Sequence, residues 1–169
     1  NDEKASFEID ELGRKKAAID AKGYRSEFHY DENGNLTCVI DANAQAGLKP
    51  KNTLGCTEHR AYDELNRVTK ITDALNGETS FTYDLLGNRL TVKDAEAKTW
   101  SFAYDDLGRL ISETDHSAKA IAYKPDQAGN VYEKTNRLNE VTRYTFDNGN
   151  RLTRVDYLKD NTAETFGYD

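Results

Sequence analysis

The sequence predicts an all-β protein made of antiparallel β-hairpin repeats of about 21 residues, and three observations support this prediction. A Tyr-Asp pair returns at a fixed spacing, aromatic residues alternate along the segment before it, and Asp and Gly mark a tight turn after it. Self-similarity at about 20 to 50 residues is typical of folds in which each small unit must stack on its neighbours. Function is therefore expected to belong to the array of units, not to one pocket.

The repeat fills the whole chain. Its copies begin at seven positions, each followed by Asp: Ile9, Tyr30, Tyr62, Tyr83, Tyr104, Pro125 and Phe146. All neighbouring copies are 21 residues apart except the second and third, which are separated by 11 additional residues. We therefore expect a single array of seven units over residues 1–169, with an insertion at about residues 42–58. Because the sequence closes on a further Tyr-Asp pair, we also expect the array to be truncated at both ends.

Aromatic residues recur at the reference Tyr and two positions before it. Residues two apart on a strand share a face, so these rings form a stripe on an extended segment. Buried tyrosine rings and cross-strand aromatic pairs are then the expected source of stability in a chain with little apolar material. The predicted structural aromatics are Phe28, Tyr30, Tyr62, Phe81, Tyr83, Trp100, Phe102, Tyr104, Tyr123, Tyr144 and Phe146.

The residues after the reference position have the chemistry of a tight hairpin turn. Asp at the first corner can accept hydrogen bonds from the backbone amides ahead of it, and Gly or Asn at the fourth tolerates a positive φ. The predicted turn residues are Asp31, Gly34, Asp63, Asn66, Asp84, Gly87, Asp105, Gly108, Asp126, Gly129 and Asp147.

Beyond each turn the chain is expected to return as a second strand, and an Asp or Asn eleven positions after the reference begins a second turn. The apolar positions of this return strand do not alternate simply. Leu110 and Val131 are apolar at one offset, whereas Ile71, Val92 and Val155 lie three positions later in the unit. This pattern requires either a β-bulge or partial burial on both faces, and the sequence leaves both alternatives open.

Units such as Phe81–Leu90 and Phe102–Leu110 resemble the tyrosine-aspartate (YD) repeats of bacterial Rhs proteins, insecticidal toxin complexes and animal teneurins. The resemblance extends over nearly the whole chain. It implies a long curved or spiral β-sheet that forms the wall of a hollow shell. In the bacterial members such a shell encloses a toxin domain until delivery. The resemblance therefore implies a secreted or cell-surface protein whose partners are the rest of the parent shell and an enclosed toxin domain.

Composition and charge exclude several other classes. A hydrophobic content of 37% and a mean hydropathy of -0.86 leave little material for the thick core of a compact enzyme. The net charge of -7 argues against nucleic acid and anionic membranes as partners. No apolar run is long enough for a membrane span, and residues 1–4 are not a signal peptide, so any targeting signal is expected outside this fragment.

The sequence predicts no catalytic residue, metal or cofactor. The recurring Asp lacks the clustering of calcium loops, and its turn role is favoured. His29, Cys38, Cys56 and His59 match no zinc module, and the adjacency of His116 to Ser117 supplies neither an oriented base nor an oxyanion hole. We therefore expect a protein that is not an enzyme.

Cys38 and Cys56 flank the insertion, which contains the segment Ala42–Lys51. A disulfide between them would staple the insertion in an oxidising compartment. With only two cysteines in the chain, the sequence favours reduced thiols, and the disulfide stays an alternative.

Two function hypotheses remain. The first is a segment of an encapsulating wall. The second is a module that binds carbohydrate or another cell-surface ligand, because exposed rings beside Asp and Asn can stack on sugars and repetition gives avidity. Rings buried against neighbouring strands would favour the wall, and rings lining an open groove would favour glycan binding. In either case the unpaired edges of the sheet are expected to promote self-association.

Overall fold

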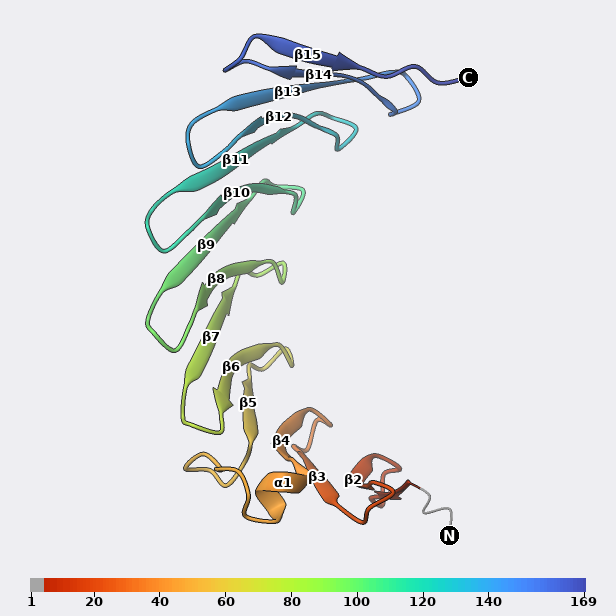
Figure 1. Cartoon of the computed structure of the whole chain (residues 1–169), viewed down its shortest axis with the longest axis vertical. Helices are drawn as coiled ribbons and strands as arrows, with labels where there is room; N and C mark the ends of the chain where they lie inside the picture. Colours follow the sequence, from red (N-terminus) through yellow and green to blue (C-terminus); the bar gives the residue numbers. More distant parts are fainter. Residues whose placement is uncertain (1–4) are drawn as a thin grey trace. The chain divides into compact units, whose positions relative to one another are not determined.

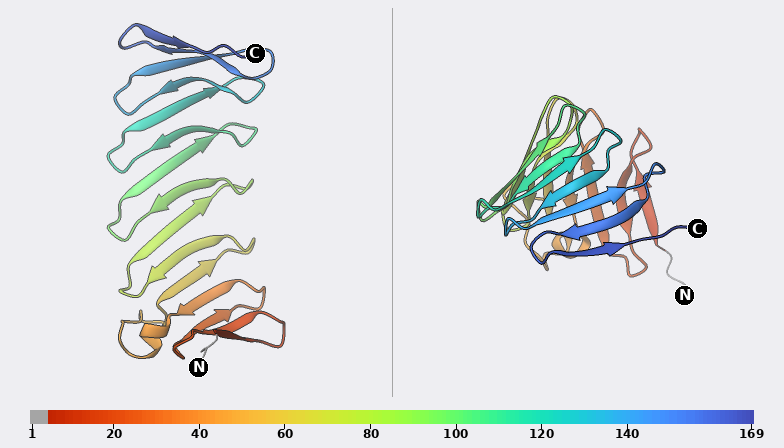
Figure 2. Two further views of the ribbon diagram at one scale, coloured as in Figure 1. Left: turned by 45° about the vertical axis from the view of Figure 1, so that its right-hand side comes forward. Right: turned by 90° about the horizontal axis from the view of Figure 1, so that it is seen from above.

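The computed structural model describes residues 5–169, and this part of the chain is almost entirely β-structure (Figure 1). Fifteen strands form a single sheet in which each strand is hydrogen-bonded to its neighbours in the sequence, from β1 to β15. The turns that join successive strands lie alternately at the two opposite ends of the strands (Figure 2). The predicted all-β fold of antiparallel hairpins is confirmed.

The chain divides into two compact units, which we describe separately. The first contains the residues up to Phe81 together with Lys93–Ala97, and the second contains Thr82–Val92 and Lys98–Asp169. The elements of the first unit are β1 (Ser6–Ile9), β2 (Lys15–Ile19), β3 (Arg25–Tyr30), β4 (Leu36–Ile40), α1 (Ala42–Gln45), β5 (Glu58–Tyr62), β6 (Val68–Asp73) and most of β7 (Glu78–Tyr83).

The second unit contains most of β8 and all later strands. These are β8 (Arg89–Lys93), β9 (Thr99–Tyr104), β10 (Leu110–Thr114), β11 (Ala120–Pro125), β12 (Val131–Thr135), β13 (Val141–Phe146), β14 (Leu152–Tyr157) and β15 (Thr162–Thr165). Strands of four to six residues joined by short turns follow from the spacing of the turn residues in the sequence.

A β-bulge in the return strand resolves the irregular apolar pattern. In the β3–β4 hairpin Tyr30 faces Leu36, but His29 faces Cys38, so Thr37 is an additional residue on the return strand. Positions three apart in β4 therefore lie on one face. The register shifts at the same place in five other hairpins, which are β1–β2, β5–β6, β9–β10, β11–β12 and β13–β14. Of the two alternatives left open by the sequence, the bulge is present.

Buried apolar residues are few. In residues 5–169 the buried hydrophobic residues are Ala17, Ala44, Cys56 and Val155. The eleven predicted structural aromatics are all half-buried, so the expectation of buried tyrosine rings was too strong. In each unit the rings lie on a sheet that the described residues do not cover with a second layer.

The insertion between the second and third repeats forms α1 and a loop. The Asp41 side chain caps α1 by accepting a hydrogen bond of 2.7 Å from the Ala44 amide. The chain then returns through a turn at Asn52, whose side-chain oxygen accepts hydrogen bonds from the Leu54 and Cys56 amides at 3.1 and 3.0 Å. Asn52 thus takes over the turn that Asp41 would have begun in an uninterrupted repeat.

Candidate functional site: the turn edge and the aromatic face

The recurring Asp organises each first turn through its carboxylate. Asp10 Oδ1 accepts hydrogen bonds from the amides of Leu12 and Arg14 at 3.0 and 2.9 Å. The Gly13 amide donates to the Asp10 carbonyl, and Gly13 has a φ of 77°. This is a type I turn closed by a residue in the left-handed region, which is a common connection between twisted strands.

The predicted turn residues all lie in turns of this kind. The carboxylates of Asp31, Asp63, Asp84, Asp105, Asp126 and Asp147 accept backbone amide hydrogen bonds from residues ahead of them. Positive φ angles between 60° and 95° are found at Gly34, Asn66, Gly87, Gly108 and Gly129. The pKa of each of these carboxyl groups lies below its ordinary value, because hydrogen bonds stabilise the charged form.

A second feature of the turn was not found by the sequence analysis. Four positions after each Asp, Arg and Asn alternate without exception: Arg14, Asn35, Arg67, Asn88, Arg109, Asn130 and Arg151. Each of these side chains donates a hydrogen bond of 2.7 to 3.2 Å to the second carboxylate oxygen of the Asp in its own turn. The alternation is visible in the sequence, but its structural role depends on which residues of the next turn lie beside the Arg or Asn side chain.

Arg14 and Arg109 also reach the next first turn of the array. Arg109 Nη1 donates to the carbonyl of Asp126 at 2.6 Å, and Arg14 Nη1 donates to the carbonyl of Asp31 at 3.3 Å. One guanidinium therefore joins two successive hairpins by bonding a carboxylate in one and a backbone oxygen in the other.

The asparagines reach the next turn differently. Asn35 Nδ2 lies 2.7 Å from Asn66 Oδ1, and Asn130 Nδ2 lies 3.0 Å from Asn150 Oδ1. Asn66 and Asn150 occupy the positive-φ position that Gly occupies in the other first turns. An amide-to-amide hydrogen bond thus replaces the arginine bridge where both turns carry Asn.

The reference tyrosine forms another bond between hairpins. Its hydroxyl donates to the carbonyl of the first residue of the preceding return strand, in the pairs Tyr30 with Lys15, Tyr62 with Leu36, Tyr104 with Arg89 and Tyr168 with Leu152. The distances are 2.7 to 3.1 Å. In the case of Leu36, pairing with the next strand begins only at Cys38. The hydroxyl therefore satisfies a carbonyl that the ladder leaves unpaired.

The aromatic face is held by contacts between neighbouring strands. The Arg89 guanidinium lies 4.9 Å from the centre of the Phe102 ring, and the Arg14 guanidinium lies 4.7 Å from that of Tyr30. Trp100 makes an edge-to-face contact with His116, with ring centres 5.3 Å apart. Phe102, Tyr30 and Trp100 are thus each in contact with a side chain from an adjacent strand or turn, although they stay half-buried.

The opposite face carries an ion network across three strands. Glu133 on β12 pairs with Lys124 on β11 at 2.6 Å and with Arg143 on β13 at 2.9 Å. These three residues are in register, so both bonds run straight across the sheet. The hydrogen bonds from Lys124 and Arg143 lower the pKa of Glu133.

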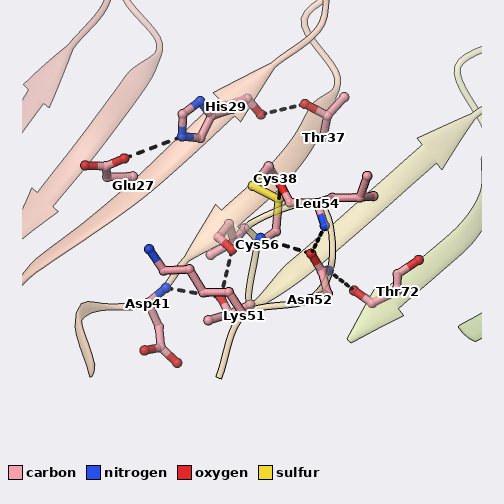
Figure 3. The surroundings of a disulfide bond; sticks show 12 residues. Glu27, His29, Thr37, Cys38, Asp41, Lys51, Asn52, Leu54, Cys56 and Thr72 are labelled. Atoms are coloured by element: carbon pink, nitrogen blue, oxygen red, sulfur yellow. Dashed lines mark hydrogen bonds and ion pairs between the residues drawn. A yellow bond between two sulfur atoms is a disulfide. The ribbon is translucent and has the colours of Figure 1, made fainter. Parts of the chain in front are cut away.

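Cys38 and Cys56 form a disulfide, so the expectation of reduced thiols was wrong (Figure 3). The reason lies in the path of the insertion. The Thr57 amide donates to the Val39 carbonyl at 2.8 Å, and Asn52 donates to the Thr72 carbonyl at 3.2 Å. The loop is therefore anchored beside β4, which leaves the two Cα atoms 5.6 Å apart, within the usual range for a disulfide. Sequence spacing could not show that return path.

Residues 5–169 contain no group of three or more His, Cys, Asp or Glu side chains arranged to hold a metal ion. Cys38 and Cys56, which the sequence offered as zinc ligands together with His29 and His59, are bonded to each other in the disulfide. In the same part of the chain no helix has the length and apolar character needed to cross a membrane.

Comparison with known proteins agrees with this geometry. The sequence matches the family described as Teneurin YD-shell over residues 5–169. No curated protein matches the sequence. Among solved structures, the fold is similar to that in the Tc holotoxin pore of Photorhabdus luminescens, with a TM-score of 0.70 and 15% identity over 90% of this chain and 9% of that one. It is also similar to TcdB2-TccC3, with a TM-score of 0.72 and 15% identity over 95% of this chain and 10% of that one.

Proposed function

Because this chain belongs to the teneurin YD-shell family, we propose that it is one segment of a shell wall that encloses a toxin domain for delivery. The observation that carries the proposal is the set of bonds between hairpins. Arginine bridges, asparagine pairs and tyrosine hydroxyls each bind one hairpin to the next. Such contacts serve to extend a sheet by identical steps, which is what a wall requires.

The similar structures support the enclosed partner. Both come from toxin complexes, and this chain spans about a tenth of the chains that it matches. The partners in our proposal are therefore the rest of a parent shell and the toxin domain inside it.

The proposed role is not catalytic. The acidic residues that recur in the repeat use their carboxylate oxygens to accept backbone amides and the Arg or Asn of the same turn. The pKa of Asp10 and that of Asp84 lie below the ordinary value, so these carboxylates stay charged at neutral pH and below, which suits a turn acceptor and not a proton donor.

We place the protein outside the cell or on its surface. The disulfide supports this location, because structural disulfides persist mainly in oxidising compartments.

The proposal can be tested by limited proteolysis of the full-length protein that contains this segment. We expect the enclosed domain to resist cleavage in the parent protein. In the double variant Arg109→Gln and Tyr104→Phe, which removes two kinds of bond between hairpins, the enclosed domain should become cleavable at a lower protease concentration. Lys119→Gln, an exposed change in a second turn, serves as the matched control. An enclosed domain that is cleaved equally fast in all three proteins would contradict the proposal.

A further inference from the structure

A trough on the aromatic face of the second unit combines an apolar lining with one ammonium group. Its volume is about 280 Å³, and it is lined by residues of β11 to β14: Tyr123, Val131, Lys134, Tyr144, Phe146 and Leu152. The three rings come from two different strands, so the lining extends across several neighbouring hairpins. The trough is therefore a feature of the array that no single repeat could form.

Lys134 is the only charged residue of the lining. It faces Tyr123 on β11 and Thr142 on β13, and its ammonium group lies 5.7 Å from the centre of the Tyr123 ring. In the part of the chain that the structure describes, no ion pair involves Lys134. Glu113 is the carboxylate bonded to the lining, because it accepts a hydrogen bond of 3.0 Å from the Tyr123 hydroxyl, and it forms no ion pair with Lys134. The trough thus presents a half-buried ammonium group whose charge no carboxylate pairs with directly.

The β-bulge of the β11–β12 hairpin brings Lys134 to this face. The register shifts between Lys124 and Pro125, which leaves Tyr132 as the additional residue of β12. Val131 and Lys134, three positions apart, therefore lie on the same side of the sheet. In a strand without the bulge the lysine would point to the opposite face.

Two residues of the trough depart from the pattern of the repeat. The position of Lys134 is occupied in the other units by Ala18, Val39, Ile71, Val92, Glu113 and Val155. Phe146 stands where most units have the reference tyrosine, so its ring lines the trough without a hydroxyl. Departures from the local pattern of a repeat are expected at functional sites. Here both departures occur at one place.

We propose that this trough binds a small aromatic anion, with one or two rings carrying a carboxylate or sulfonate. The rings would lie against Tyr144 and Phe146, and the anionic group would pair with the Lys134 ammonium. The volume of about 280 Å³ is just below the range of about 300 to 1,000 Å³ that is typical of pockets for drug-sized ligands, which fits a smaller ligand. A sugar fits less well, because the lining offers few polar groups for its hydroxyls. The inference does not depend on the proposed shell function.

Titration with 2-naphthoate, followed by chemical-shift changes in the whole chain, tests the proposal. We expect the changes to be confined to the residues of the trough. The neutral probe 2-naphthamide should bind about fivefold more weakly, in keeping with a partly exposed ion pair. Lys134→Val restores the side chain found in three other units, so it should fold and should bind both probes equally. Lys134→Gln removes the charge but keeps an unbranched polar side chain, one atom shorter than lysine, and gives the same comparison.

Lys119→Gln is the matched control, because it removes an exposed lysine just before β11 and should leave the preference for 2-naphthoate unchanged. The proposal would be overturned by an absence of shift changes at the solubility limit of 2-naphthoate. It would also fail if the two Lys134 variants kept the preference for the anion, or if Lys119→Gln abolished it.

Discussion

At the scale of the residue, the φ angles in the turns show which residue types fit the backbone conformation and which are strained by it. In the turn that begins at Asp115, Ala118 has a φ of 61°, whereas Gly23 occupies the equivalent position of the turn that begins at Asp20. A left-handed conformation costs a residue with a β-carbon about 1 kcal/mol, and glycine avoids this cost. Glycine loses part of the gain through its greater freedom in the unfolded chain. We predict that Ala118→Gly stabilises the protein by about 0.5 kcal/mol, measured by urea unfolding.

Ala120→Gly is the matched control for this prediction. Ala120 is also exposed, but it lies in β11, where glycine weakens a strand by about 0.5 to 1 kcal/mol. The two substitutions should therefore change the free energy of unfolding in opposite directions. If both destabilised the protein equally, the strain that we assign to Ala118 would be absent.

The same residues show what sequence reasoning could reach. Asp and Gly at fixed corners predicted the turns, because their turn chemistry is local and independent of the neighbours. An alanine in a left-handed conformation has no such local preference. Its φ follows from the turn that Asp115 imposes, with the Ser117 and Lys119 amides bonded to its carboxylate.

At the scale of the element, adjacent turns are matched in pairs. Where Asn35 precedes Asn66 an amide pair forms, but Asn88 precedes Gly108, which has no side chain to offer. A β-carbon built on Gly108 would lie 3.5 Å from Asn88 Oδ1, an ordinary contact that leaves room for an asparagine. Asparagine also tolerates the positive φ of 74° at this position. The substitution Gly108→Asn should therefore create the missing pair.

We predict that Gly108→Asn is more stable than Gly129→Asn by about 1 kcal/mol, which is the typical net contribution of one hydrogen bond. Gly129 is the appropriate control because its φ is also positive and a β-carbon there would meet no atom within 4 Å. The difference should disappear when both substitutions are made in an Asn88→Ala background. Equal melting temperatures for the two variants in the parent background would argue against the matching of turns.

At the scale of the element too, some features could be predicted from the sequence and others could not. The strands and both sets of turns follow from periodicity, and the bulge was one of two alternatives, since apolar residues three apart on a strand require a change of register. The disulfide was the less favoured alternative, because the pairing of Cys38 with Cys56 depends on a loop anchored by bonds from Thr57 and Asn52. The bonds between successive turns were missed because they join residues about 17 to 31 positions apart.

At the scale of the whole molecule, stability rests on many similar turns and not on a large apolar core. Among the described residues, eight turn aspartates have a pKa below the ordinary value: Asp10, Asp31, Asp63, Asp84, Asp105, Asp115, Asp126 and Asp147. For Asp10 the main cause is the hydrogen bond from the backbone amide of Arg14, and for Asp105 it is the hydrogen bond from the Arg109 side chain.

These lowered pKa values predict how stability depends on pH. An aspartate in an unfolded chain has a pKa of about 3.9, so above that pH both states are charged and the folded state keeps the full benefit of its hydrogen bonds. As the pH falls below about 3.9, the unfolded chain takes up protons before the folded protein does. Stability is therefore lost as the pH falls from the pKa of the unfolded chain to the lower pKa of the folded state. We therefore predict a nearly constant melting temperature between about pH 7 and 5 and a steep fall below about pH 4.

The double variant Asp105→Asn and Asp147→Asn tests this prediction. It should show a shallower fall in melting temperature with acid, because two of the titrating groups are removed. It should be less stable at pH 7 but still fold, because an amide oxygen can accept the backbone amides of the turn, as Asn136 does. A melting temperature that declines equally steeply in the parent and the variant would show that acid acts elsewhere in the molecule.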